Sequence, residues 1–300
     1  MRKRILTLAA AVALLAVTVL PAQAITFGEP DDGEHPYVGF TLFHDPTGWF
    51  SCSGSALADD VFLTAGHCLY NVTTDLVPSA DTTGGTDIWV TFAEEPDLST
   101  FPATIDYGDD IAARDADRLA WLQDLDNGFI RGTANPHPEY DDFASFPNTH
   151  DVGVVELPSD TYSGDVAVLA GVGVLDELTA GGKGHNKVIV ETVGYGIQQI
   201  TPVFMAVDAR YKSTSKIINL KSNLTDGINV HTSNNPSAQH GTGGSCFGDS
   251  GGPMLLNNTD EVVGIVSFGF SLTCHGSDWA YRADIADTQD FVNGFLGPAG

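Results

Sequence analysis

Short apolar or alternating segments recur along most of the chain, and clusters of Gly, Pro, Asp and Asn separate them. Runs of this length between turn-forming residues are typical of strands in antiparallel sheets. The clearest segments are residues 37–43, 61–65, 86–92, 152–157, 188–193 and 262–268. The length of 300 residues suits two packed β units, and the change of composition at residues 157–165 marks the expected crossing between them.

Two segments depart from this pattern. Residues 109–125 place apolar side chains at partly helical spacing after an Asp pair that can cap a helix. We expect one or two helical turns there, within an acidic surface insertion at residues 93–132. The insertion could shape a cleft, bind calcium through its carboxylates, or do neither. Residues 283–296 predict a terminal helix that lays one apolar face on the body of the protein.

The first 24 residues have the parts of an export signal. Three basic residues precede an apolar run at residues 5–20, and Ala-Gln-Ala at 22–24 supplies the small residues that a signal peptidase needs. The run is shorter than the roughly 20 residues of a membrane-spanning helix. We therefore expect a signal peptide at residues 1–24, a secreted protein (extracellular or periplasmic) without stable membrane insertion, and Ile25 as the first mature residue.

Acidic side chains dominate the charge. The formal net charge is −26, and it becomes −29 when the three basic residues of the signal are removed. Such a surface repels nucleic acid and anionic membranes. An apolar content of 42% with 33 Gly and 15 Pro fits a large, loop-rich globular protein. We expect a monomer without a nucleic-acid partner.

The four cysteines, Cys52, Cys68, Cys246 and Cys274, all follow the signal, and an oxidising compartment favours disulfides. Three pairings are possible. Nearness in sequence favours Cys52 with Cys68 and Cys246 with Cys274, loops in which each bridge contributes about 3 kcal/mol in the chain-entropy model. A zinc site is the alternative, but none of these cysteines lies in a C-x2-C pair. No metal and no cofactor are expected.

Three separated motifs carry the parts of one chemistry. Acyl transfer by a serine requires a base, an acid that orients the base, and backbone donors for the oxyanion. His67 ends an apolar run in FLTAGHC, Asp151 precedes another in HDVGVVEL, and Ser250 lies in GDSGGP. Taken alone, each residue is more often a core histidine or a turn former. Their joint appearance favours the catalytic interpretation.

These motifs, together with SGSAL and GIVSFG, resemble the trypsin-like (chymotrypsin-fold) serine proteases in the same chain order. The resemblance spans most of the mature chain. It implies an all-β fold of two packed six-stranded antiparallel Greek-key barrels with a C-terminal helix. The first barrel would span residues 25–160 and the second residues 161–300. The implied activity is that of a serine-type endopeptidase acting on protein or peptide substrates.

The resemblance also implies roles for individual residues. Ser250 would be the nucleophile, His67 the general base and acid, and Asp151 the carboxylate that fixes the imidazole tautomer. The backbone N–H groups of Gly248 and Ser250 would form the oxyanion hole. The family's disulfides match the two pairings that proximity already favours.

The new amino terminus has an expected role in activation. Mature members of the family usually begin with Ile or Val, whose ammonium pairs with the aspartate before the catalytic serine. Here Ile25 directly follows the signal, and no separate pro-peptide is evident. We hypothesise that signal cleavage itself frees the Ile25 ammonium to pair with Asp249.

A specificity pocket is expected next to the nucleophile, and its lining residues would be Gly244, Ser245, Ser267, Gly269 and Trp279. The resemblance places Gly244 at the pocket base, where it cannot attract a cation. Trp279 aligns with a position that is usually glycine in the family, so its indole would narrow the pocket. This predicts a small or medium apolar P1 residue rather than Lys or Arg. A buried acid from Asp278 is the alternative.

Two other functions compete with proteolysis. GDSGG also satisfies the G-x-S-x-G motif of α/β-hydrolases, but that fold needs a helix after the serine and an Asp and a His downstream. Pro253 follows instead, and only 50 residues remain after Ser250. The second competitor is a catalytically weak or inactive member of the same fold that acts as a secreted binding protein. The intact triad argues against it, whereas a pocket blocked by Trp279 would favour it.

Overall fold

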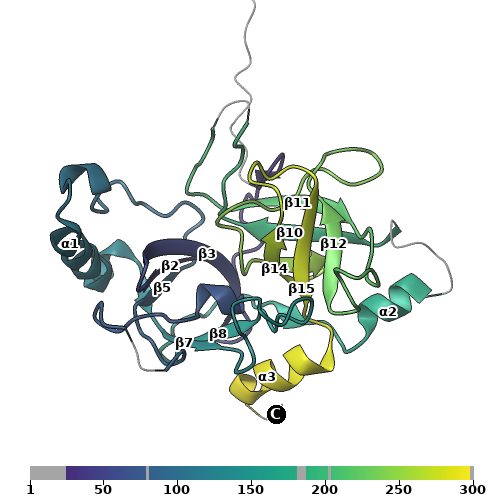
Figure 1. The fold of residues 1–300 in the computed structure, drawn as a ribbon, viewed down its shortest axis with the longest axis horizontal. Helices are drawn as coiled ribbons and strands as arrows, with labels where there is room; N and C mark the ends of the chain where they lie inside the picture. Colours follow the sequence, from purple (N-terminus) through teal and green to yellow (C-terminus); the bar gives the residue numbers. More distant parts are fainter. Residues whose placement is uncertain (1–24, 79–80, 181–186, 202–203, 298–300) are drawn as a thin grey trace, which may run out of the picture.

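The computed structural model describes residues 25–78, 81–180, 187–201 and 204–297, so the expected export signal lies outside the described residues. Two sheets lie next to each other in Figure 1, and the terminal helix lies below the junction between them. Within the described ranges, no helix is long and apolar enough to cross a membrane.

The first sheet forms the first barrel. Its strands are β2 (Val38–Asp45), β3 (Gly48–Ala56), β4 (Val61–Thr64), β5 (Ile88–Thr91), β6 (Ile130–Arg131), β7 (Thr133–Pro136) and β8 (Gly153–Glu156). They are ordered β6-β5-β2-β3-β4-β8-β7. Only Gly132 separates the two end strands β6 and β7, and its N–H donates to the carbonyl of Ile88 at 3.0 Å, so the sheet curls back on itself.

The second sheet forms the second barrel. Its strands are β1 (Glu29–Pro30), β9 (Val168–Leu169), β10 (Ile189–Gly194), β11 (Tyr211–Lys216), β12 (Asn229–Ser233), β13 (Pro253–Leu256), β14 (Glu261–Gly269) and β15 (Ser277–Arg282). The main path is β1-β11-β10-β13-β14-β15-β12. β9 adds a short parallel pairing with β14.

The expected all-β fold of two antiparallel barrels with a C-terminal helix is confirmed. The sheets contain seven and eight strands because two-residue strands such as β1 and β9 add to the expected six. β1 brings the beginning of the described chain, which the sequence placed with the first barrel, into the second sheet. The boundary between residues 160 and 161 stays a prediction.

The helices are α1 (Ile111–Gln123), α2 (Val174–Thr179) and α3 (Ala286–Leu296), with 3-10 turns η1 (Gly66–Cys68), η2 (Thr104–Asp106) and η3 (Leu125–Asn127). α1 is longer than the one or two turns expected, and the carboxylate of Asp110 caps it by accepting from the N–H of Ala113 at 3.0 Å. α3 is the predicted terminal helix, with Val292 fully buried. α2 was not predicted.

α3 joins the two barrels. It follows β15 of the second barrel but packs against β4 and β8 of the first. Asp287 on α3 accepts a hydrogen bond from the ring of His150 at 2.8 Å. Phe291 packs edge-on against the ring of His137, with 4.8 Å between centroids. The helix therefore holds the loop that leads into β8.

A buried polar network at Asp31 also joins the barrels. Asp31, between β1 and β2, accepts from Arg210 Nε at 2.8 Å and from the His35 backbone N–H at 3.0 Å, and it pairs with the His35 ring. Arg210 donates in turn to the carbonyl of Val38 at 3.1 Å. Burial disfavours the charged forms of both Asp31 and Arg210. Hydrogen bonds from His35 and Arg210 outweigh this effect on Asp31 and lower its pKa to about 2. Despite its own burial, His35 has its pKa raised to about 9 by Asp31 and Glu191.

We expect Asp31→Asn to lower the free energy of unfolding by about 3–5 kcal/mol, because it leaves the Arg210 guanidinium buried without its charge partner. The measurement is guanidinium chloride unfolding at pH 7. Glu29→Gln, at an exposed position two residues earlier, is the control and should change stability by less than about 0.5 kcal/mol. Equal effects of the two variants would contradict the role given to Asp31.

Candidate active site

His67 lies in η1, directly after the fully buried strand β4. β4 pairs with β8 so that Thr64 faces Gly153, which places the end of one strand beside the beginning of the other. Asp151 lies two residues before β8 and therefore meets the turn that carries His67. A disulfide between Cys52 and Cys68, with Cα atoms 6.3 Å apart, ties this turn to β3.

Asp151 is fully buried and holds His67 through two of its groups, the backbone N–H and the ring Nδ1. Its Oδ1 accepts from the His67 backbone N–H at 2.8 Å, and its Oδ2 lies 2.9 Å from the ring Nδ1. The hydroxyl of Ser267, from β14 of the second barrel, also donates to Oδ2. Burial opposes ionisation of both partners. The attraction and the hydrogen bonds between them prevail, so the pKa of Asp151 is lowered and that of His67 is raised.

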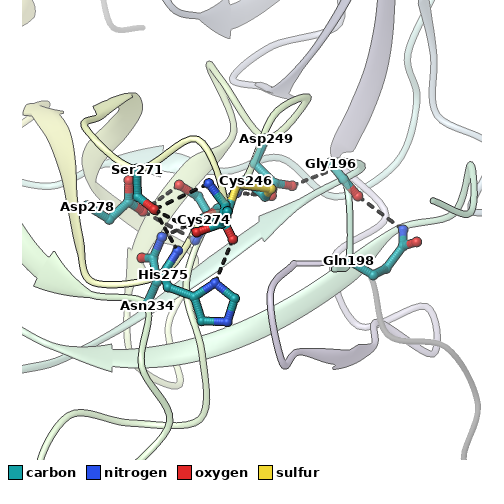
Figure 2. The surroundings of a disulfide bond; sticks show 11 residues. Gly196, Gln198, Asn234, Cys246, Asp249, Ser271, Cys274, His275 and Asp278 are labelled. Atoms are coloured by element: carbon teal, nitrogen blue, oxygen red, sulfur yellow. Dashed lines mark hydrogen bonds between the residues drawn. A yellow bond between two sulfur atoms is a disulfide. The ribbon is translucent and has the colours of Figure 1, made fainter. Parts of the chain in front are cut away.

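The segment that carries Ser250 runs between β12 and β13 of the second barrel, and β3 of the first barrel fastens it. The Ser53 N–H donates to the carbonyl of Ser250 at 2.8 Å, and the Ser53 hydroxyl donates to the carbonyl of Gly248 at 2.9 Å. Gly248 has φ of +99°, a conformation that favours glycine. A second disulfide, Cys246–Cys274, anchors the same segment (Figure 2).

Two cavities of about 550 and 660 Å³ share Asp45, His67, Phe247 and Ser250 as lining residues. We call them the first and the second cavity. The structure thus brings the three proposed triad residues to one place, with His67 and Asp151 supplied by the first barrel and Ser250 by the second. Ser250 lines both cavities, so a bound chain could continue in two directions from it.

Asp249, next to Ser250, is fully buried. Its carboxylate accepts from the backbone N–H groups of Cys246 and Gly196 at 2.8 and 2.7 Å (Figure 2). It forms no ion pair with any residue that the structure describes. Burial raises its pKa to about 7, and the nearby charge of Asp278 adds to this. In the 300-residue chain the nitrogen of Ile25 is part of a peptide bond, so it carries no charge.

The structure differs from the sequence expectation for the specificity pocket. The first cavity is lined by Ser245, Ser267 and Gly269, as expected, but not by Gly244 or Trp279. Successive side chains of a strand point to opposite faces. In β15, Asp278 therefore lines the cavity, whereas the Trp279 indole is buried on the other face.

Trp279 is held away from the cavity by aromatic stacking. Its ring lies parallel to those of Phe268 and His231, with centroids 5.4 and 4.7 Å away. The expected narrowing of the pocket by Trp279 is therefore wrong. The alternative residue, Asp278, takes the place that Trp279 was expected to hold.

Asn234 is a site residue that the sequence did not indicate. A Cβ at Gly244 would lie 2.0 Å from Asn234 Oδ1, so the Asn234 side chain occupies the space that a larger residue 244 would need. Asn234 Nδ2 donates to the carbonyl of Ser245 at 2.9 Å, while its buried Oδ1 has no hydrogen-bond partner among the described residues. No local motif marks position 234, because only the fold brings it to residue 244.

Asp278 is the buried carboxylate of this cavity, which Asp45 and Asp142 also line. Its carboxylate accepts from the backbone N–H of Ser245 at 3.2 Å and from the Ser245 hydroxyl. Burial raises its pKa to about 6, against the hydrogen bonds from Ser245. At neutral pH the first cavity therefore ends in a carboxylate and the free acceptor of Asn234, both suited to a hydrogen-bond donor with positive charge.

Two clusters of potential metal ligands are not arranged for an ion. Cys52 and Cys68, near His67, are joined in a disulfide and offer no thiolate. His137, His150 and Asp287 form the other cluster. The two imidazoles are stacked within 12° of parallel, and His137 Nδ1 accepts the Glu139 backbone N–H at 3.1 Å. A ligating histidine normally donates through its second nitrogen, so this arrangement does not suit coordination through Nε2.

A comparison with family models matches residues 125–291, more than half of the chain, to the family described as Trypsin. The chain belongs to the trypsin family. The matched range includes Asp151 and Ser250 and excludes His67, whose position rests on the geometry above. No curated protein matches the chain significantly.

Solved structures show the same fold. HL collagenase is 16% identical with a TM-score of 0.61, and the match covers 92% of this chain and 100% of the collagenase. Human heparin binding protein is 14% identical with a TM-score of 0.56, covering 92% and 98% of the two chains. A thermostable serine protease, AL20, from an extremophilic microorganism is 15% identical with a TM-score of 0.52, covering 88% and 98%. These likenesses establish a trypsin-like serine protease fold.

Proposed function

We propose that the protein is a secreted serine endopeptidase that cleaves peptide bonds through an acyl-enzyme on Ser250. The observation that carries this proposal is the buried Asp151–His67 pair, 2.9 Å apart at Oδ2 and Nδ1, beside the cavities that Ser250 lines. A carboxylate bound to Nδ1 directs the free imidazole nitrogen, Nε2, to act as the base.

The steps follow from these positions. His67 Nε2 takes the proton of Ser250 as Oγ attacks the scissile carbonyl, and the N–H groups of Gly248 and Ser250 stabilise the oxyanion. The imidazolium then gives its proton to the leaving amine, and the C–N bond breaks. Water attacks the acyl-enzyme with His67 again as base, releasing the acid and restoring Ser250. Asp151 stays ionised, since its pKa is lowered, and stabilises the imidazolium in both halves.

The first cavity supports a substrate with a cationic P1 side chain. Asp278 and Asn234 present acceptors there, and no cation of the described residues neutralises Asp278. A Lys or Arg side chain would supply the missing donors. This proposal replaces the apolar P1 expected from the sequence, because that expectation depended on Trp279.

A binding role without catalysis is less well supported. Human heparin binding protein shares the fold. Heparin is a polyanion, however, and the net charge of −26 would repel it. All three triad side chains are present and two of them are hydrogen-bonded to each other.

We also propose that the ammonium of mature Ile25 pairs with Asp249. Ile25 is fully buried, and Thr26 pairs with Gly244 in the segment that leads to Asp249. A buried carboxylate whose pKa is raised to about 7 would gain from a cation. The pairing would stabilise the segment that supplies the oxyanion donors.

The triad is tested with a fluorophosphonate probe on the mature protein. We expect Ser250 to be labelled, as identified by peptide mass spectrometry, because only an activated hydroxyl reacts. Ser250→Ala should abolish labelling, and His67→Ala should slow it by at least about 1,000-fold. Ser271→Ala, which changes a different cavity serine, should retain the label. Labelling that persists in Ser250→Ala would overturn the proposed mechanism.

The activation proposal is tested with two purified forms, one beginning at Ile25 and one extended by a single Gly. We expect the extended form to keep its circular dichroism spectrum and lose fluorophosphonate labelling, because its ammonium lies one residue too far away. Asp249→Asn, starting at Ile25, should behave like the extended form. Full labelling of the extended protein would contradict the ion pair.

The P1 proposal is tested with peptides that differ only in Arg or its uncharged isostere citrulline at P1. We expect kcat/KM for Arg to exceed that for citrulline at pH 8. The ratio should fall by roughly tenfold at pH 5, because the pKa of Asp278 is about 6 and the protonated acid no longer attracts a cation. Protonation of His67 affects both substrates and cancels in the ratio. Asp278→Asn should remove the preference, and a preference for citrulline in the unmodified enzyme would refute the proposal.

A further inference from the structure

The second cavity begins at Ser250 but does not include the proposed P1 residues Asp278 and Asn234. It is lined by residues of β2 and β3, by residues 195–197 and 206–208, and by Phe101 and Arg118 of the insertion that carries α1. If the acyl part of a substrate occupies the first cavity, the residues after the scissile bond have the second cavity available. The inference below rests on the proposed function in this respect.

Large apolar side chains line this cavity, and several are exposed. Phe50 on β3 is 46% exposed and Phe247, three residues before Ser250, is 51% exposed. Phe43 packs against Phe50 with 5.8 Å between centroids. Exposed aromatic surface that continues from a catalytic residue is typical of a binding site rather than of free surface. We call the cavity bounded by Phe43, Phe50, Phe101, Arg118, Val207 and Phe247 the leaving-group trough.

Arg118 contributes the trough's positive charge. It lies on α1, where its guanidinium stacks on Phe101 at 5.0 Å from the ring centroid. Its Nε donates to the carbonyl of Pro102 at 2.9 Å and its Nη2 to the Thr104 hydroxyl at 3.3 Å. Among the described residues it forms no ion pair, whereas Arg114, one turn earlier, pairs with Asp115 at 2.7 Å. Arg118 is therefore held in place and keeps donors for a carboxylate.

Two carboxylates also line the trough. Asp45 Oδ1 is occupied by the turn after β2, because it accepts from the backbone N–H groups of Thr47 and Gly48 at 2.6 and 3.0 Å. Asp208 belongs to the wall formed by the second barrel, next to Val207, and burial raises its pKa. Arg118 stacks on Phe101, whose ring centroid lies 6.4 Å from that of Trp49, so these three residues line one part of the trough. Arg118 is the only Lys or Arg among the described residues that line the trough.

We propose that the leaving-group trough binds the part of the substrate that follows the scissile bond, and that Arg118 selects an acidic residue there. A large apolar side chain next to the bond would pack on Phe50 and Phe247. An Asp or Glu farther along would reach the guanidinium of Arg118, whose planar fork suits a carboxylate. The insertion at residues 93–132 would then extend substrate selection beyond the P1 pocket.

Acyl transfer tests this side of the site separately from P1. An ester with Arg at P1 forms the acyl-enzyme, and peptides H-Leu-(Gly)n-Asp-NH2 with n of 0, 1 or 2 compete with water to take the acyl group. The matched peptides carry Asn in place of Asp. We expect one Asp peptide to be a better acceptor than its Asn partner by about fivefold to tenfold, as for a hydrogen-bonded ion pair.

Three variants separate the interpretations. Arg118→Gln should abolish the Asp preference, and Arg118→Lys should retain part of it because the charge remains. Lys221→Gln removes an exposed cation that does not line either cavity, and it should leave the preference unchanged. Because each rate is a partition against water on the same acyl-enzyme, differences in overall activity cancel.

The outcomes distinguish this inference from the proposed function. If the ester is hydrolysed and all Asp and Asn peptides react equally, the role of Arg118 is overturned and the protease proposal stands. The role is also overturned if the Asp preference persists in Arg118→Gln. If the ester is not hydrolysed and Ser250 is not labelled, both proposals fail.

Discussion

The carboxylate of Asp151 is the interaction on which the arrangement of the site depends. It is fully buried, so its charge requires partners close by. Two come from His67 in the first barrel, and the third is the Ser267 hydroxyl on β14 of the second. Satisfying one buried charge therefore requires both barrels to be in place. The same contact that orients the imidazole also fixes how the barrel carrying His67 meets the barrel carrying Ser250.

The few Lys and Arg residues of this acidic chain also hold separate parts of the structure together. The sequence contains 13 Lys and Arg against 39 Asp and Glu, so most carboxylates must rely on water for solvation. Two arginines are nevertheless almost completely buried. Arg210 joins Asp31 to the first barrel, and Arg282 pairs with Asp284 and with Asp176 at the start of α2. Arg210 thereby connects the two barrels, and Arg282 on β15 fastens α2 to the second barrel.

Features that depend on residues close in sequence were easier to predict than contacts that form only in the folded protein. The strand rhythm, the terminal helix and the two cysteine pairings depend on residues close in sequence, and the structure contains all of them. The motifs around His67, Asp151 and Ser250 could be identified because each is a short contiguous stretch that resembles a motif of the family. Asn234 had no such signal, because its contact with Gly244 forms only when the segment after β12 folds back on itself.

The error at Trp279 has a related cause. Its assignment to the pocket came from an alignment, and a shift of one residue in a strand moves every side chain to the other face. Pairing of β14 with β15 sets the register, and an irregularity between Val266 and Phe268 lies beside this point. Periodicity within β15 alone could not reveal which of Asp278 and Trp279 faces the cavity. The predicted α1 was too short because the apolar residues of this segment are only partly at helical spacing. The Asp110 cap marks where the helix begins but does not indicate its length.

Two buried acids on either side of one disulfide explain why the site would require cations from elsewhere. Asp249 and Asp278 surround the Cys246–Cys274 bridge in Figure 2, and neither has an ion pair with the described residues. Ionised Asp278 raises the pKa of Asp249, so charge on one acid disfavours charge on the other. A cation at either acid therefore makes ionisation of its neighbour easier. If the Ile25 ammonium occupies Asp249 and a P1 side chain occupies Asp278, maturation and substrate binding are coupled through these two charges.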